Sequence, residues 1–157
     1  MTVRDVLEAS LEAAIEIRRI EETTQIRRES IGVQGHSYGF HSKSGILDPS
    51  RKIVDLIMWE EEQVSSEDLR GPIDDAYEIV CGIATISDDL TVEIVTRRYL
   101  QGESWVEIAR DLADARHIDT LQGLTRKQQV DLMSKAIDAD MELWDRIGIA
   151  HLREMGR

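Results

Sequence analysis

The chain has 157 residues, of which 41% are apolar and 32% charged, with a formal net charge of −12 at pH 7. This length can supply one core, and the low content of aromatic residues and proline favours an all-α fold over a strand-rich sandwich. The negative charge argues at first against nucleic-acid binding, because phosphate contacts need Lys and Arg. No run approaches the roughly 18 apolar residues that cross a bilayer, and no signal peptide pattern opens the chain, so we expect a cytoplasmic protein without membrane contact.

The first half of the chain has the pattern of two long helices joined by a loop. Apolar residues recur at a spacing of three to four from Val3 to Ile20, which marks a narrow helical face that needs a partner helix. Residues 31–47 are rich in glycine and serine and have no period, so they predict a long loop. A second helix is expected to follow Asp48 and to kink or break near Gly71, because Pro72 lacks the amide hydrogen that a helix needs.

Residues 3–28 and 50–86 are therefore expected to pair as an antiparallel, coiled-coil-like hairpin. His36 and His41 lie in the predicted loop without a Cys or acidic cluster beside them, and a glycine-rich loop does not hold ligands rigidly, so no metal site is predicted. Cys81 is the one cysteine and lies in an apolar run, which indicates a small core residue in a reducing compartment.

The second half of the chain carries two successive helix-start signals. A helix that begins near Asp89 is expected to end at Gly102, which is suited to the left-handed conformation that closes a helix. In "SWVE", Ser104 and Glu107 can form a reciprocal capping box that starts a short helix at Trp105. Trp105 is expected to pack over the end of the preceding helix. The predicted inner face of this short helix holds Val106, Ile108, Ala109 and Leu112.

The second start signal is "TRKQ", in which Thr125 and Gln128 repeat the capping pattern. The helix that follows carries an apolar side of Val130, Met133, Ala136, Ile137 and Met141. Two short helices, a turn and a helix with a basic first turn form the layout of a helix-turn-helix reader, and a plain helical bundle is the alternative. Residues 91–137 hold seven Lys and Arg and seven Asp and Glu, so all of the excess negative charge lies outside this window.

The stretch "TVEIVTRRYLQGESWVEIARDL", residues 91–112, resembles the phage and prophage regulators that are similar to region 4 of sigma factors, including the late-gene regulators of the ArpU and RinA type. The resemblance implies a hairpin over residues 1–86 and a helix-turn-helix domain over residues 87–157. The chain departs from this pattern by an insertion at residues 113–124. The residues that match are Arg98, Tyr99, Leu100, Gly102, Ser104, Trp105, Glu107, Ile108, Ala109 and Leu112.

The predicted function is sequence-specific binding of double-stranded DNA by a transcriptional regulator of phage or prophage type. The alternatives are a helical module that docks on RNA polymerase, and a structural coiled coil that forms a homo-oligomer. No enzyme, catalytic residue or cofactor is predicted, because the histidines are scattered and no phosphate-binding loop precedes a helix. The candidate DNA-binding residues are Arg116, His117, Thr125, Arg126, Lys127, Gln128 and Lys135.

Overall fold

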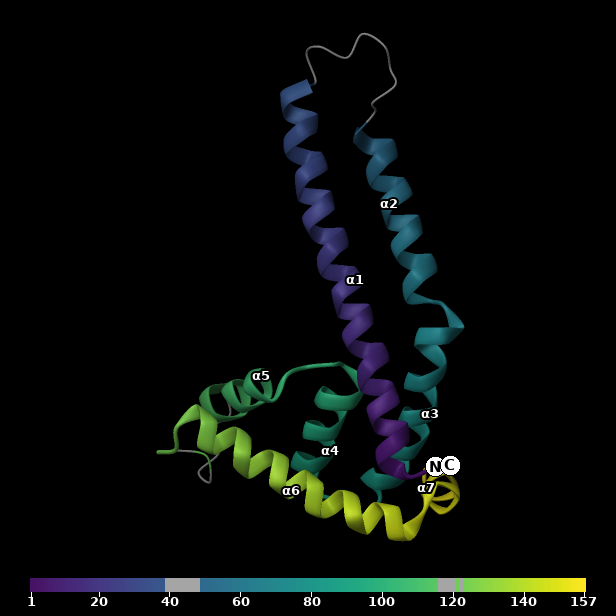
Figure 1. The fold of residues 1–157 in the computed structure, drawn as a ribbon, viewed down its shortest axis with the longest axis vertical. Helices are drawn as coiled ribbons and strands as arrows, with labels where there is room; N and C mark the ends of the chain where they lie inside the picture. Colours follow the sequence, from purple (N-terminus) through teal and green to yellow (C-terminus); the bar gives the residue numbers. More distant parts are fainter. Residues whose placement is uncertain (39–48, 116–120, 122) are drawn as a thin grey trace.

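Throughout the residues that the structure describes, the regular elements are helices (Figure 1). The computed structural model describes residues 1–38, 49–115, 121 and 123–157. Two π-helical segments, η1 (Thr96–Leu100) and η2 (Asp111–Ala115), directly continue α4 and α5. The predicted all-α fold is confirmed over this part of the chain. The α-helices are α1 (Val3–Tyr38), α2 (Pro49–Val64), α3 (Glu67–Ala84), α4 (Asp89–Val95), α5 (Trp105–Arg110), α6 (Arg126–Ile147) and α7 (Ile149–Met155).

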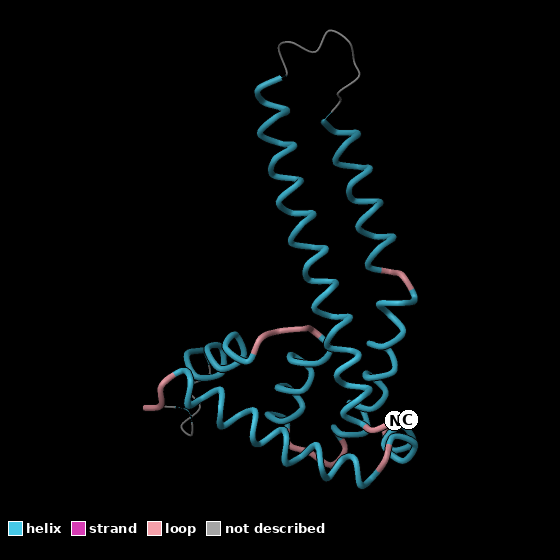
Figure 2. The backbone as a smooth tube through the Cα atoms, in the orientation of Figure 1, coloured by secondary structure: helices cyan, strands magenta, loops and turns pink. Residues whose placement is uncertain are grey.

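The molecule consists of a two-helix stalk that rises from a wider body (Figure 1). We define the stalk as α2 together with the part of α1 that follows Ile20, and the body as the remaining elements. The helices α2 and α3 run back along α1, in the opposite direction, and both contact it. The connection between α2 and α3 is short, as is the one between η1 and α5 (Figure 2). Both chain ends lie at the base of the body, at the end of the molecule away from the stalk (Figure 1).

Burial is concentrated in the body. One apolar cluster joins side chains from both halves of the sequence, including Leu7 of α1, Ile79 of α3 and Ile137 of α6. The stalk is different, because residues 50–64 contribute no buried side chain and residues 21–30 contribute only Thr24. Since buried apolar area supplies most of the free energy of folding, we infer that the body is the stable part of the molecule.

Two sequence-based predictions about the first half are wrong. The loop expected over residues 31–47 begins later, because α1 continues to Tyr38; the rest of that segment, including His41, lies outside the described residues. Adding residues to an existing helix costs far less than starting one, so a long preceding helix can extend into a sequence with weak helical preference.

The kink or break expected near Gly71 is instead a break at Ser65 and Ser66. There the Ser65 hydroxyl donates to the Glu61 carbonyl and the Arg70 Nε donates to the Val64 carbonyl at 2.9 Å. The helix α3 then passes through Pro72. Glycine at position 71 has no Cβ to collide with the proline ring, which removes one of the two obstacles to a helix at this site.

The base of the body is held by α6. The Asp145 carboxylate accepts hydrogen bonds from the backbone amides of Val3 at 2.8 Å and Arg4 at 3.4 Å. It therefore satisfies amides at the start of α1, where a negative charge is also favourable to the helix dipole. Beside it, Trp144 is 1% exposed. The second half of α6 is thus fixed to the body, and the position of its first half follows from it.

The helices α3 and α7 approach each other closely at Gly82. A Cβ built on this glycine would lie 2.0 Å from the carbonyl oxygen of Leu152 in α7. Gly71, in the same helix, has room by the same criterion, since its Cβ would meet only the Glu67 Oε1 at 3.6 Å. The two glycines therefore form a matched pair in which one position is tightly packed and the other is not.

Gly82→Ala is expected to displace α7 and to lower the free energy of unfolding by about 1–3 kcal/mol, because the added methyl group meets backbone that cannot yield. Gly71→Ala should change it by less than about 1 kcal/mol, since the gain in helix propensity opposes the clash with Pro72. Urea unfolding followed by circular dichroism measures both. Equal effects of the two substitutions would contradict the close packing of α3 on α7.

Candidate nucleic-acid interface

The stretch that carries the resemblance reverses direction in the turn between η1 and α5. Gly102 has a φ of 71°, as its predicted role required, and a Cβ there would also lie 2.9 Å from the Ala14 carbonyl carbon of α1. The helix before it ends as a π-helical turn, and the Gln101 amide donates to the Thr96 carbonyl at 3.1 Å. The glycine thus lets the chain reverse while it presses directly on the α1 backbone.

Arg97 ties the two sides of this turn together. Its Nε lies 2.6 Å from the Glu103 Oε2, and its Nη2 reaches both the Glu103 Oε1 and the Asp111 carboxylate. The Arg97 side chain is only 14% exposed. The Glu103 carboxylate raises the pKa of Arg97, and Arg97 in turn lowers the pKa of Asp111. The turn, η1 and η2 are therefore held by one charge-assisted network.

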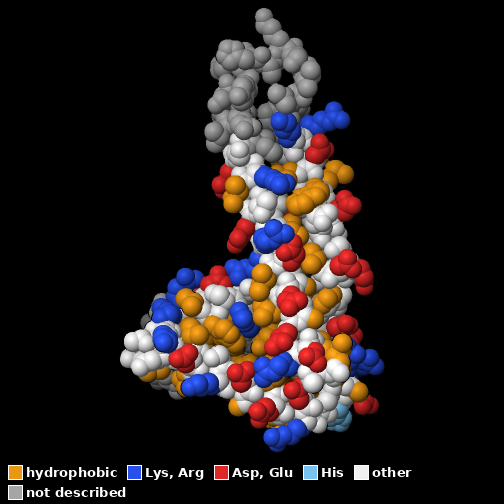
Figure 3. All heavy atoms as spheres, viewed as in Figure 1, with side chains coloured by type: hydrophobic (Ala, Val, Ile, Leu, Met, Phe, Trp, Pro, Cys, Tyr) orange, Lys and Arg blue, Asp and Glu red, His pale blue; other side chains and the backbone are white. Residues whose placement is uncertain are grey.

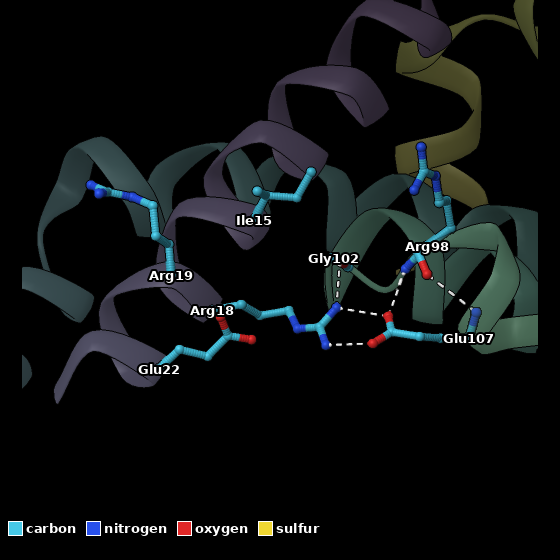
Figure 4. Close-up of a pocket in the computed structure, with 8 residues that line it drawn as sticks. Ile15, Arg18, Arg19, Glu22, Arg98, Gly102 and Glu107 are labelled. Atoms are coloured by element: carbon cyan, nitrogen blue, oxygen red, sulfur yellow. Dashed lines mark hydrogen bonds and ion pairs between the residues drawn. The ribbon is translucent and has the colours of Figure 1, made fainter. Parts of the chain in front are cut away.

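The predicted capping box at the start of α5 is confirmed. The Ser104 hydroxyl accepts from the Glu107 amide at 3.2 Å, and the Glu107 carboxylate accepts from the Ser104 amide at 2.8 Å. The same carboxylate also receives a two-pronged contact from Arg18 of α1, with both nitrogen to oxygen distances at 2.9 Å (Figure 4). Arg18 further donates to the Gly102 carbonyl at 2.9 Å. The contact between Arg18 and Glu107 was not predicted, because the two residues are far apart in the sequence.

The residues around this contact line a shallow groove between α1 and α5 (Figure 4). Ile15, Arg18, Arg19 and Glu22 line it from α1, and Arg98 and Glu107 line it from the other side. Ion pairs occupy much of the polar lining, so we interpret the groove as the joint between α1 and α5.

Low pH is expected to break the ion pair between Arg18 and Glu107 at this joint. Arg18, and then the Ser104 amide, lower the pKa of Glu107 from its ordinary 4.5 to about 2. A carboxyl whose pKa is lower in the folded protein stabilises the fold above the unfolded pKa, and that stabilisation disappears as pH falls through the folded pKa. Glu107→Gln keeps a capping-box side chain but loses the ion pair. We therefore expect its melting temperature to lie below that of the wild type above about pH 5, with the gap closing toward about pH 2.

Glu12→Gln is the control for this measurement, because Glu12 is exposed on α1 outside the joint. It should leave the melting temperature near that of the wild type at every pH, since exposed substitutions of this kind change stability by about 0.5 kcal/mol or less. A gap for Glu107→Gln that stays constant between pH 7 and pH 2 would refute the assigned role of its charge.

The face of α5 that packs inward differs from the prediction at one position. Ile108, Ala109 and Leu112 are fully buried as expected, but Val106 is 52% exposed. At about 100° per residue, position 106 lies nearly opposite position 108 on the helix, which accounts for the error. Trp105 is half-buried against the core, and the Arg98 guanidinium lies 5.2 Å from its ring centroid. Trp105 is thus a packing residue, as predicted, although it is only partly covered.

The second capping box, at the start of α6, is also confirmed. The Thr125 hydroxyl accepts from the Gln128 amide at 3.3 Å, and the Gln128 side-chain carbonyl accepts from the Thr125 amide at 3.0 Å. Each of these two predicted DNA-binding residues therefore uses its side chain to start the helix. Their contribution to binding would come from the remaining donors, the Gln128 amide group and the Thr125 hydroxyl.

Gln129, for which no role was predicted, holds the segment that precedes α6. Gln129 is 7% exposed, and its Nε2 donates to the carbonyls of Leu121 at 2.9 Å and Leu124 at 3.3 Å. The Arg126 Nη1 donates to the Gln129 Oε1 at 2.9 Å. One signal for this role was present, because Gln129 precedes Met133, the next buried position of α6, by four residues.

We define the tip as residues 105–115 and 125–135, which comprise α5, η2 and the first turns of α6. α5 and α6 contact each other, and α5 with the first turns of α6 forms the end of the body that lies farthest from α7 (Figure 1). Part of the insertion predicted at residues 113–124 lies outside the described residues, and so do Arg116 and His117. Of the remaining candidates, Arg126 is half-buried, whereas Thr125, Lys127, Gln128 and Lys135 are exposed.

The acidic and basic side chains of the tip differ in how far ion pairs engage them. Glu107 and Asp111 are engaged by Arg18 and Arg97, which belong to other elements. Arg110 is 57% exposed and lies 3.7 Å from Asp111, and Lys127 and Lys135 are exposed on α6 with Asp131 between them. Figure 3 shows basic side chains gathered over this end of the body. Residues 105–115 and 125–135 hold four Lys and Arg and four Asp and Glu, so a basic character of this surface depends on the ion pairs that engage Glu107 and Asp111.

Comparison with known proteins gives no match to a family model, a curated protein or a solved structure. Among the described helices, none combines the length and apolar character needed to cross a membrane. Within the same residues, no three His, Cys, Asp or Glu side chains are grouped so that they could hold a metal ion.

Proposed function

We propose that the protein is a DNA-binding transcriptional regulator and that its tip is the DNA-binding surface. The observation that carries this proposal is the packing of α5 on the start of α6, with a capped, exposed and basic first turn on the second helix. In helix-turn-helix proteins, the N-terminal residues of the second helix contact base edges while the first helix crosses the backbone. Here α6 would be the reading helix and α5 the helix that crosses the phosphates.

The dimensions of α6 suit this role. Residues 126–135 span about 15 Å at 1.5 Å per residue, and the major groove is about 12 Å wide. The remainder of α6 is anchored by Trp144 and Asp145, so its first half is carried on a rigid support. A reading helix gains specificity when its orientation is set before binding, because less conformational entropy is then lost in the complex.

The residues divide into three proposed roles. Lys127 and Gln128, in the first turn of α6, have donors suited to base edges, and Lys127 also suits phosphate. Arg110, on α5, and Lys135, two turns further along α6, would contact the backbone. Arg126 would act through the fold, because it supports Gln129 and thereby the approach to the helix. A more specific proposal is that the protein regulates phage or prophage genes in the manner of sigma factor region 4. This proposal depends on the sequence resemblance.

The proposal is tested by titrating the purified protein against labelled fragments of the genome that encodes it. We expect a small subset of fragments to bind at least about 1,000-fold more tightly than the rest, which is the lower end of the range for specific regulators. Protein that binds no fragment at low salt would exclude this function and would favour docking on RNA polymerase or a structural role.

A further inference from the structure

The stalk helix α2 carries two lines of residues with coiled-coil spacing. The first line faces α1 and consists of Ile53, Ile57, Glu60 and Val64, all of which are half-buried. It is reinforced by Arg28 of α1, whose Nη2 lies 3.7 Å from the Glu60 Oε2. This line accounts for the packing of α2 on α1.

The second line consists of Arg51, Val54, Met58 and Glu61, at successive spacings of three, four and three residues. It lies about a third of a turn around α2 from the first line, at 100° per residue. Val54 is 52% exposed and Met58 is 62% exposed, and both charged residues are exposed as well. Apolar residues at this spacing are typical of a helix that packs along a second partner helix.

The second line is complementary to itself. If a copy of α2 is laid antiparallel with its centre at position 56, Val54 lies opposite Met58 of the copy, and Arg51 lies opposite Glu61. By two-fold symmetry each contact occurs twice. The pairing therefore contains two apolar contacts and two ion pairs, each between an arginine and a glutamate. A parallel pairing would instead set Arg51 against Arg51 and Glu61 against Glu61, which is repulsive. The charge order therefore selects the antiparallel arrangement.

We propose that this second line is the interface through which two copies of the chain associate, α2 against α2. The partner is a second copy because the line is complementary to its own sequence in both charge and apolar content. The proposal is independent of DNA binding, which involves the tip. The interface is small, so we expect a dissociation constant of about 10–100 μM, as in weak, reversible assemblies.

The test uses charge reversal in two separate variants. Arg51→Glu alone sets two carboxylates opposite each other, and Glu61→Arg alone sets two guanidinium groups opposite each other, so each variant should associate at least about 10-fold more weakly than the wild type. An equimolar mixture of the two variants allows a mixed dimer, in which one of the two contacts joins two wild-type residues and the other joins two substituted residues. In the antiparallel pairing each contact joins position 51 of one copy to position 61 of the other, so each contact of the mixed dimer joins a carboxylate to a guanidinium group.

The mixed dimer therefore keeps two ion pairs, and an equimolar mixture of the two variants should associate about as strongly as the wild type. The double variant Arg51→Glu with Glu61→Arg restores both ion pairs with their signs exchanged, so it should associate about as strongly as the wild type. Sedimentation equilibrium over a range of concentrations measures all of these constants.

Lys52→Glu is the matched control, because it changes the same charge in the same turn but lies 100° away from Arg51 around the helix. It should associate like the wild type. A wild-type protein that stays monomeric up to about 1 mM, or a double variant no stronger than the single variants, would overturn the proposal. Circular dichroism of each variant shows whether it is folded. If either single variant does not fold, it is replaced by Val54→Asp, which should also weaken association.

Discussion

Replacing both Lys127 and Lys135 by glutamate is expected to weaken DNA binding by at least about 100-fold at about 0.1 M salt. The two side chains are the exposed cations in the first half of α6, the proposed reading helix. Each substitution removes an attraction to DNA and adds a repulsion. The fold should be unaffected, because neither side chain is buried. Fluorescence anisotropy with the tightest genomic fragment gives the affinity, and a thermal melt checks the fold.

Two controls separate the tip from a general effect of charge. Asp131→Asn, between the two lysines, removes a negative charge and should strengthen binding several-fold. Lys52→Glu in the stalk makes the same change of charge as Lys127→Glu but lies outside the tip, so it should bind DNA like the wild type. Arg126 is left out of this design because it donates to Gln129 and its reversal would also disturb the fold. If Lys52→Glu weakened binding as much as the double substitution at Lys127 and Lys135, the tip would not be the binding surface.

Trp144→Ala is expected to lower the free energy of unfolding by about 3–5 kcal/mol. The indole is 1% exposed and lies in the shared core of the body, so its loss leaves a cavity that neighbouring side chains fill only in part. The next residue, Asp145, satisfies the amides at the start of α1. A shift of α6 would therefore weaken two contacts together. Urea unfolding followed by circular dichroism measures the effect.

Leu143→Ala is the control for this substitution, because its side chain precedes Trp144 on α6 but is 48% exposed. It should cost less than about 1 kcal/mol. If the two substitutions cost the same, α6 would not be anchored at its second half, and the rigid support inferred for the tip would be lost.

The parts of the fold that could be predicted from the sequence are those with local causes. Both capping boxes depend on pairs of residues three positions apart, and Gly102 depends on its own backbone angles, so each has a signal within one turn of the chain. The helix break was misplaced although its causes are also local. Proline is a strong signal, but glycine before it and a serine pair upstream changed the outcome.

The long-range contacts had no such signal. Asp145 caps α1 across 142 residues of sequence, and Arg18 contacts Glu107 across 89. Nothing in the spacing of either residue identifies its partner, because the contact exists only after the helices have packed. For the candidate site, the sequence located the start of α6 correctly but not the role of Gln129, whose polar side chain is buried to hold the preceding turn.

The most direct test of the central claim is the dependence of DNA affinity on salt for the wild type and for Lys127→Ala. If the tip binds DNA through phosphates and base edges, the logarithm of the association constant falls steeply with the logarithm of the salt concentration. Removing one phosphate contact should make this slope shallower by about 0.9. A wild-type affinity that does not change with salt, or identical slopes for the two proteins, would contradict DNA binding through the start of α6.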